Sequence, residues 1–205
     1  MKTEIDAKVV KKLRDATGAG MMNCKKALLD NDGDYEKAIE SLRLKGMATA
    51  DKKANRNTNE GLIYSYIHTG NKLGILIEVN CETDFVARRE EFSDLAKNIA
   101  MQIASNPEIQ VVSMENISEL KRKEIESFEN SKEDVQNKPE EIRKKIIEGR
   151  VEKSLKREVL LEQEYIRDSN ITVNDYIKQV ISLLGENIRV ARFTRFVLGE
   201  TQVEE

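Results

Sequence analysis

Few residues of this 205-residue chain could take part in covalent or metal chemistry. The chain contains one histidine, His68, and two cysteines, Cys24 and Cys81, which are far apart in the sequence. One imidazole and two isolated thiols cannot supply the four ligands of a usual zinc site. No serine or cysteine motif accompanies His68, which we expect to be a surface or packing residue and not a general base. The sequence therefore predicts no enzymatic activity, no metal site and no cofactor.

Two kinds of nucleotide-binding motif are also missing. The stretch GAGMMN, residues 18–23, lacks the third glycine of a dinucleotide fingerprint and follows a predicted helix instead of a strand. The chain contains no G-x-x-x-x-G-K-[ST] motif, so it carries no phosphate-binding loop of that type. We therefore expect the isolated chain to bind neither GDP nor GTP.

Charge and hydropathy exclude further classes of protein. Charged residues make up 35% of the chain, but they nearly cancel and leave a formal net charge of −3. Such a balance is typical of solvated helices and not of a strongly basic nucleic-acid binder. The chain has no run of eighteen apolar residues and no signal-peptide-like run at its start. We expect no direct nucleic-acid binding, no membrane span and no secretion.

The stretch NCETDFVARREEF, residues 80–92, places an aromatic residue beside an acid at the start of a predicted helix over 84–105. On a helical wheel, Phe92 begins an apolar stripe that continues through Leu95, Ala96, Ile99 and Ile103. Arg88 and Arg89 fall on the same side, one turn earlier. The core stripe therefore ends before the helix does, and Phe85 is predicted to project past the edge of the core.

The geometry of Phe85 leaves two interpretations open. In the first, Phe85 staples the start of the helix and Asp84 complements the helix dipole. In the second, Phe85 anchors a protein–protein contact, because an aromatic side chain beside a charge is common among interface hot spots.

Three short helical patterns precede this region and predict a compact module over residues 1–45. Turns at 17–20 and 30–34 separate the patterns, and Asp34 is expected to cap the third helix. Residues 46–60 lose the periodicity and are small, polar and basic, which predicts a flexible linker. An arm that contacts phosphates is the alternative for this segment, although no aromatic residues alternate with the basic ones.

From Gly61 the apolar period changes to two, which predicts a hairpin with its turn at 69–71. Mostly charged helices are expected over 114–157, with a break near Pro139, and a further helix ends at Gly185. The final stretch is predicted to be a strand that pairs with the hairpin and shares one face among Ile188, Val190, Arg192, Thr194, Phe196 and Leu198. The fold class is α+β: an N-terminal three-helix module followed by a core, residues 61–200, of a small antiparallel sheet packed with helices.

Three stretches of the chain resemble the signatures of the translation elongation factor Ts family. They are LRDATGAGMMNCKKAL at 13–28, TDFVAR at 83–88 preceded by LIEVNCE, and GENIRVARF at 185–193. They occur in the family's order and cover both ends and the middle of the chain. The chain resembles the short members of the family, which carry one copy of the core unit instead of two.

The resemblance implies a guanine nucleotide exchange factor for the GTPase elongation factor Tu. It implies that residues 1–45 form a ubiquitin-associated-like docking module, in which Arg14, Met21 and Met22 contact the partner. The alternative for these three is two core methionines and a solvated arginine. The resemblance also implies that Thr83, Asp84, Phe85 and Val86 are the working segment, and that Phe85 wedges between partner helices and disturbs the bound magnesium and phosphates.

The resemblance further implies a homodimer, with residues 61–200 as core and dimerisation domain. The chain begins directly with family-like sequence, so we expect no transit peptide. Its richness in Lys, Asn and Ile suits an AT-rich genome, and we expect a bacterial cytoplasmic protein or a plastid-encoded protein of the stroma. An RNA-binding translation accessory protein that uses the basic linker is the alternative function.

Overall fold

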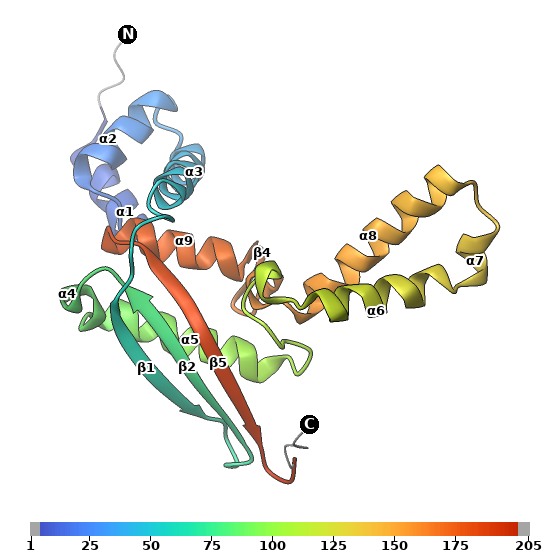
Figure 1. The fold of residues 1–205 in the computed structure, drawn as a ribbon. Helices are drawn as coiled ribbons and strands as arrows, with labels where there is room; N and C mark the ends of the chain where they lie inside the picture. Colours follow the sequence, from blue (N-terminus) through green and yellow to red (C-terminus); the bar gives the residue numbers. More distant parts are fainter. Residues whose placement is uncertain (1–4, 201–205) are drawn as a thin grey trace. The chain divides into compact units, whose positions relative to one another are not determined.

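The computed structural model describes residues 5–200, and contacts divide the chain into two compact units. The first unit runs to Leu62 and also includes residues 80–95 and 175–189. The second unit contains residues 63–79, residues 96–174 and the chain from Val190 onward. Figure 1 shows the elements along the chain.

The N-terminal part of the first unit contains helices α1 (Ala7–Thr17), α2 (Met21–Asp30) and α3 (Tyr35–Asp51) (Figure 1). The Asp6 side chain caps α1, and the Asp34 side chain caps α3 by accepting a 3.1 Å hydrogen bond from the backbone N–H of Lys37. Gly18 ends α1 in the left-handed conformation, with φ of 68°. One buried cluster joins the three helices, formed by Val10, Leu13, Cys24, Ala27, Leu28, Ala38 and Leu42. The predicted N-terminal helices are confirmed.

The segment predicted to be a linker is partly helical. Helix α3 continues to Asp51, so residues 46–51 are helical. A Cβ atom at Gly46 would lie 2.9 Å from the Ser182 Oγ, and Ala50 is buried. The small residues of this stretch allow the helix to pack closely, and in the sequence they interrupt the apolar period. The residues between α3 and β1 are 52–59, and we call them the linker from here on. The division of the chain into domains at residues 45 and 60 stays a prediction.

A three-stranded sheet contains β1 (Glu60–Ile67), β2 (Leu73–Cys81) and β5 (Ile188–Val197), in the order β1-β2-β5. The β1–β2 turn contains Gly70 and Asn71, with φ of 93° and 56°. The His68 N–H donates a 2.8 Å hydrogen bond to the Leu73 carbonyl and closes the hairpin. The predicted hairpin, and its pairing with the C-terminal strand, are confirmed.

Burial changes along the predicted face of β5. Ile188 and Val190 are buried, but Phe196, which lies on the same face, is exposed. From Ala191 onward the opposite face, which includes Phe193, is half-buried instead. Strand parity fixes which residues share a face, but the elements that cover each face change along the strand.

The predicted helix over 84–105 is two helices, α4 (Asp84–Ala87) and α5 (Glu90–Ser105). Arg88 and Arg89 lie between them and are exposed. A continuous helix would turn these two charged side chains toward the core, where unpaired charges are costly, so the break keeps them in solvent. The core stripe of α5 is confirmed, since its predicted members are fully buried: Phe92, Leu95, Ala96, Ile99 and Ile103.

The second unit contains a helical hairpin of α6 (Glu119–Asn130) and α8 (Glu140–Glu158), joined by the short α7 (Glu133–Gln136) (Figure 1). Pro139 lies at the N-cap of α8, in agreement with the predicted break. Short 3₁₀ turns occupy η1 (Met114–Asn116) and η2 (Leu160–Glu162). The hairpin has its own buried cluster of Val135, Ile147, Val151 and Leu155.

Two short strands, β3 (Glu164–Tyr165) and β4 (Asp168–Thr172), pair antiparallel and were not predicted, because they are short and mostly polar. Helix α9 (Val173–Leu184) follows them and ends at Gly185, with φ of 82°, as predicted. No helix in the described part of the chain is long and apolar enough to cross a membrane.

Candidate functional site

The segment Thr83–Val86 contains the N-cap and the first three residues of the one-turn helix α4, which follows β2 closely. Thr83 is extended, with φ of −132°, and precedes α4. The Ala87 and Arg88 amides donate 3.2 Å hydrogen bonds to the carbonyls of Thr83 and Asp84. Because consecutive positions of a helix point about 100° apart, this turn separates the directions of the neighbouring Phe85 and Val86 side chains.

Phe85 points outward and Val86 points inward. The Phe85 side chain is 80% exposed, whereas Val86 is 7% exposed and anchors the turn. The Asp84 carboxylate pairs with the Arg88 guanidinium at 2.9 Å; the Arg88 side chain is largely exposed and the Asp84 side chain is about half exposed. A residue that staples a helix start would be covered by its neighbours, so the geometry favours the interpretation of Phe85 as a surface anchor.

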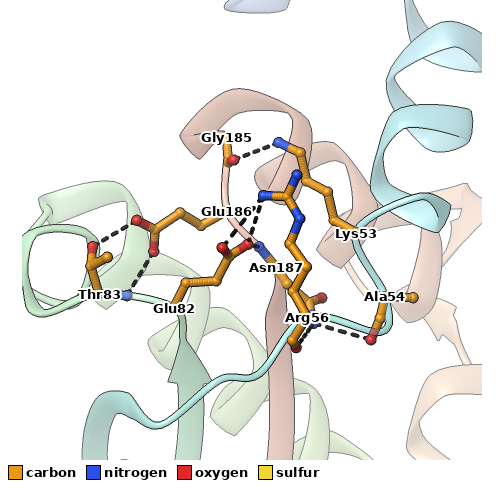
Figure 2. Close-up of polar contacts among 8 residues, drawn as sticks. All are labelled: Lys53, Ala54, Arg56, Glu82, Thr83, Gly185, Glu186 and Asn187. Carbon is orange, nitrogen blue, oxygen red and sulfur yellow. Dashed lines mark hydrogen bonds and ion pairs between the residues drawn. The ribbon is translucent and has the colours of Figure 1, made fainter.

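The base of this segment is partly buried and hydrogen-bonded. The Cys81 Sγ donates to the Thr83 carbonyl at 3.1 Å. Thr83 donates from both its N–H and its hydroxyl to the Glu186 carboxylate, at 3.0 and 2.6 Å (Figure 2). Glu186 belongs to the stretch GENIRVARF, which carries a family resemblance and leads into the predicted C-terminal strand. Its contact with Thr83 was missed because the two residues are 103 positions apart.

The three candidate residues of the N-terminal module flank a single loop, residues 18–20. Arg14 lies in the last turn of α1, and Met21 and Met22 begin α2. Met22 is 77% exposed and Met21 is 44% exposed, and neither belongs to the buried cluster of the module. The alternative of two core methionines is therefore wrong, and the loop presents two flexible apolar side chains beside an exposed arginine.

The other residues considered in the sequence analysis do not form a reactive site. His68 is exposed and contacts the Tyr66 hydroxyl at 2.9 Å. Among residues 5–200, no group of three His, Cys, Asp or Glu side chains could hold a metal ion. In the linker, Lys53 donates to the Gly185 carbonyl, and Arg56 contacts Glu82 at 3.4 Å. These two basic side chains have partners within the chain, which does not favour the phosphate-contacting arm.

Both cysteines are buried and free. Burial and the nearby negative charge of Glu186 raise the pKa of the Cys81 thiol to about 11. Between the ordinary cysteine pKa and this value, the folded state keeps a proton that the unfolded state has lost. Raising the pH through this window therefore lowers the stability of the fold.

We expect both thiols to resist alkylation in the folded protein. The thiolate is the reactive form, and burial excludes the reagent from both residues, while the raised pKa also keeps Cys81 protonated. Mass spectrometry after iodoacetamide treatment at a pH of about 8 should show an unmodified native chain and a doubly modified denatured chain. Rapid alkylation of Cys81 in the native chain would contradict this geometry.

The comparisons with known proteins cover almost the whole chain. The family model described as "Elongation factor TS" matches residues 3–200. The chain belongs to the elongation factor Ts family. The chloroplastic elongation factor Ts of Phaeodactylum tricornutum is 80% identical over 200 residues, which cover 98% of this chain and 99% of that protein.

Two further elongation factor Ts proteins are each 59% identical to this chain. The chloroplastic protein of Rhodomonas salina aligns over 98% of this chain and 91% of its own length. The bacterial protein of Synechococcus elongatus aligns over 96% of this chain and 89% of its own length. The resemblance found in the sequence, and the α+β fold that it implied, are confirmed.

Proposed function

We propose that this chain is a guanine nucleotide exchange factor for elongation factor Tu and promotes GDP release from that GTPase. Membership of the elongation factor Ts family supports the role in translation elongation. The observation that carries the mechanism is Phe85, a large aromatic side chain held 80% exposed on a one-turn helix beside Asp84.

The mechanism that we propose is differential affinity. Phe85 inserts between helices of the GTPase, and Thr83–Val86 disturbs its magnesium and phosphate site. A factor that binds the nucleotide-free GTPase better than the GDP-bound form must weaken GDP binding by the same factor. Displacing Mg²⁺ removes the charge that neutralises the phosphates, so GDP leaves faster. The chain itself makes and breaks no bond.

The second contact in this proposal is the N-terminal module, which docks on the partner through Arg14, Met21 and Met22. Unbranched methionines adapt to the shape of a partner, and arginine is frequent among interface hot spots. Two separate contacts on one chain would raise the affinity for the GTPase above that of either contact alone.

The decisive test is the release rate of labelled GDP from elongation factor Tu, measured with and without this chain. We expect release to accelerate with the concentration of the chain and to reach a plateau. Calorimetry should detect no binding of GDP or GTP to the chain alone. An unchanged release rate, or micromolar nucleotide binding by the chain alone, would contradict the proposal.

We also propose that the chain forms a homodimer through its sheet. Alternate residues are exposed in β1 and in the C-terminal half of β5, and Leu76 is exposed in β2. The large apolar side chains among them, and Leu198 just after β5, are each between 44% and 74% exposed: Ile63, Ile67, Leu76, Phe196 and Leu198. Glu78 and Arg192 pair at 2.7 Å across β2 and β5 and share the strand parity of Leu76 and Phe196, respectively. This open sheet face is an apolar patch of the kind that marks a protein contact.

The dimer is expected to be non-covalent. The middle of β5 carries Thr194 and no cysteine, and Cys24 and Cys81 are both buried, so reducing agent should leave the dimer unchanged. Phe196→Glu should dissociate it, because a charge on this face would lose its hydration in the interface. Phe128→Glu, at an exposed phenylalanine of α6, is the matched control. Sedimentation that finds a monomer at micromolar concentration, or a dimeric Phe196→Glu, would exclude this interface.

Relatives of this chain support a proposal for where it acts. Elongation factor Ts proteins similar to this chain come from chloroplasts and from bacteria. We propose that this chain works with elongation factor Tu in the plastid stroma or the bacterial cytoplasm.

A further inference from the structure

In the first unit, the loop before α4 (residues 82–83) and the loop before β5 (residues 185–187) are joined by hydrogen bonds. In these bonds, side chains of each loop accept from the backbone of the other. The Thr83 N–H donates to the Glu186 carboxylate at 3.0 Å, and the Thr83 hydroxyl donates to the same carboxylate at 2.6 Å. In the opposite direction, the Asn187 N–H donates to the Glu82 carboxylate at 2.6 Å (Figure 2). Each loop therefore satisfies a backbone N–H of the other with a charged acceptor, and such charge-assisted bonds are among the stronger ones.

The linker joins this arrangement through Asn187, whose side chain is almost fully buried. Its side-chain amide donates to the carbonyl oxygens of Ala54 and Arg56, at 3.2 and 2.9 Å (Figure 2). The Arg56 guanidinium also forms an ion pair with the Glu82 carboxylate, at 3.4 Å. We name Arg56, Glu82, Thr83, Glu186 and Asn187 the polar cluster. It connects the linker, at Ala54 and Arg56, to the first residue of the Thr83–Val86 segment.

The polar cluster makes more hydrogen bonds than are needed to satisfy the polar groups of these loops. Water could satisfy the Thr83 N–H and hydroxyl without ordering a side chain, yet here the Glu186 carboxylate accepts both bonds. Phe85 lies only two residues beyond Thr83. Fixing the backbone of Thr83 therefore fixes the direction in which α4 presents its exposed aromatic side chain.

We propose that Glu186, with Glu82 and Asn187, positions the Thr83–Val86 segment for partner binding and holds the linker in a fixed path beside it. This role rests on the proposed exchange function. The N-terminal module and α4 would contact the GTPase together, and binding costs less entropy when the contacting parts are already ordered. The polar cluster is not expected to touch the nucleotide site of the partner.

Glu186→Ala removes the acceptor and leaves Thr83 to water. We expect the concentration of the chain that gives half-maximal GDP release to rise about tenfold, as for loss of a charge-assisted pair of hydrogen bonds. The plateau rate should stay within about twofold, because Phe85 still engages once the complex has formed. Loss of a contact that disturbs the nucleotide site would instead lower the plateau.

Matched variants separate positioning from a general loss of stability. Glu186→Gln keeps an acceptor for the Thr83 N–H and should restore half-saturation to within about threefold of the wild type. Glu148→Ala removes the same charge from an exposed position on α8 and should behave as the wild type. If Glu186→Ala does not fold, Thr83→Val gives the milder comparison. Valine loses the hydroxyl bond but keeps the backbone N–H bond to Glu186, and should raise half-saturation less than Glu186→Ala.

Amide hydrogen exchange in the free protein tests the polar cluster without the partner. Glu186→Ala should speed exchange of the Thr83 amide, and Phe85→Ala should not. Three results would each overturn the inference. They are equal half-saturation for Glu186→Ala and Glu148→Ala, a Glu186→Gln variant as impaired as Glu186→Ala, and unchanged exchange of the Thr83 amide in Glu186→Ala. A wild-type chain without exchange activity would overturn the proposed function and the positioning role with it, while the Thr83 amide would still report whether the cluster forms.

Discussion

Phe85→Ala is expected to lower the efficiency of GDP exchange on elongation factor Tu about thirtyfold. A central aromatic hot spot contributes about 2 kcal/mol or more to an interface, and each 1.4 kcal/mol changes an equilibrium about tenfold. The loss should lower the plateau rate, because the wedge acts on the bound GTPase. The melting temperature should change little, since the side chain is 80% exposed and its removal leaves no cavity in the core.

The measurement is the GDP-release rate against the concentration of each variant, beside its melting curve. Phe128→Ala is the matched control, because Phe128 is also a largely exposed phenylalanine, on α6. That control should exchange as the wild type does. If Phe85→Ala also exchanges as the wild type does, Phe85 has only a structural role and the proposed mechanism fails.

Asp84→Ala should act in the same direction as Phe85→Ala but less strongly. Its carboxylate is about half exposed and pairs with Arg88, and solvent screens such charges. A loss of exchange larger than that of Phe85→Ala would show that the acid and not the aromatic residue is the main contact.

Phe92→Ala should have the opposite profile, with a large loss of stability and no specific loss of exchange. Phe92 is fully buried at the start of the α5 core stripe, seven residues after Phe85. Truncating a buried phenylalanine costs about 3–5 kcal/mol, because apolar contacts are lost and a cavity remains. That loss is a large share of the total stability of an ordinary domain.

Chemical denaturation of Phe92→Ala should show a lower midpoint, and the exchange rate per folded molecule should equal that of the wild type. The pair Phe85 and Phe92 thus separates contact with the partner from packing in one short stretch of sequence. A Phe92→Ala chain of unchanged stability would contradict the burial of the α5 stripe.

The sequence by itself determined the features that depend on local periodicity. Apolar residues at helical spacing predicted the N-terminal helices and the buried stripe from Phe92 to Ile103, because one face of a helix must be removed from water. The two arginines that interrupt this stripe predicted that Phe85 would project beyond the core. Glycines at 70 and 185 marked turns that need positive φ, and the structure has both.

The tertiary structure decided features that periodicity does not describe. Helix α3 continues through Gly46 to Asp51 because small side chains allow close packing, and small polar composition alone is equally typical of a linker. The helix break at Arg88 and Arg89 depends on where the core ends. The change of burial along β5 depends on which elements cover each face of the sheet.

The polar cluster is the clearest case of this kind. Thr83 and Glu186 are 103 positions apart, and Glu82 and Asn187 are 105 apart. Hydrophobic patterns report which residues leave water, whereas a hydrogen bond depends on the distance and direction between two particular atoms. Any of the many acidic side chains of this chain could in principle accept a hydrogen bond from the Thr83 N–H. Only in the folded chain does the Glu186 carboxylate lie within hydrogen-bond distance.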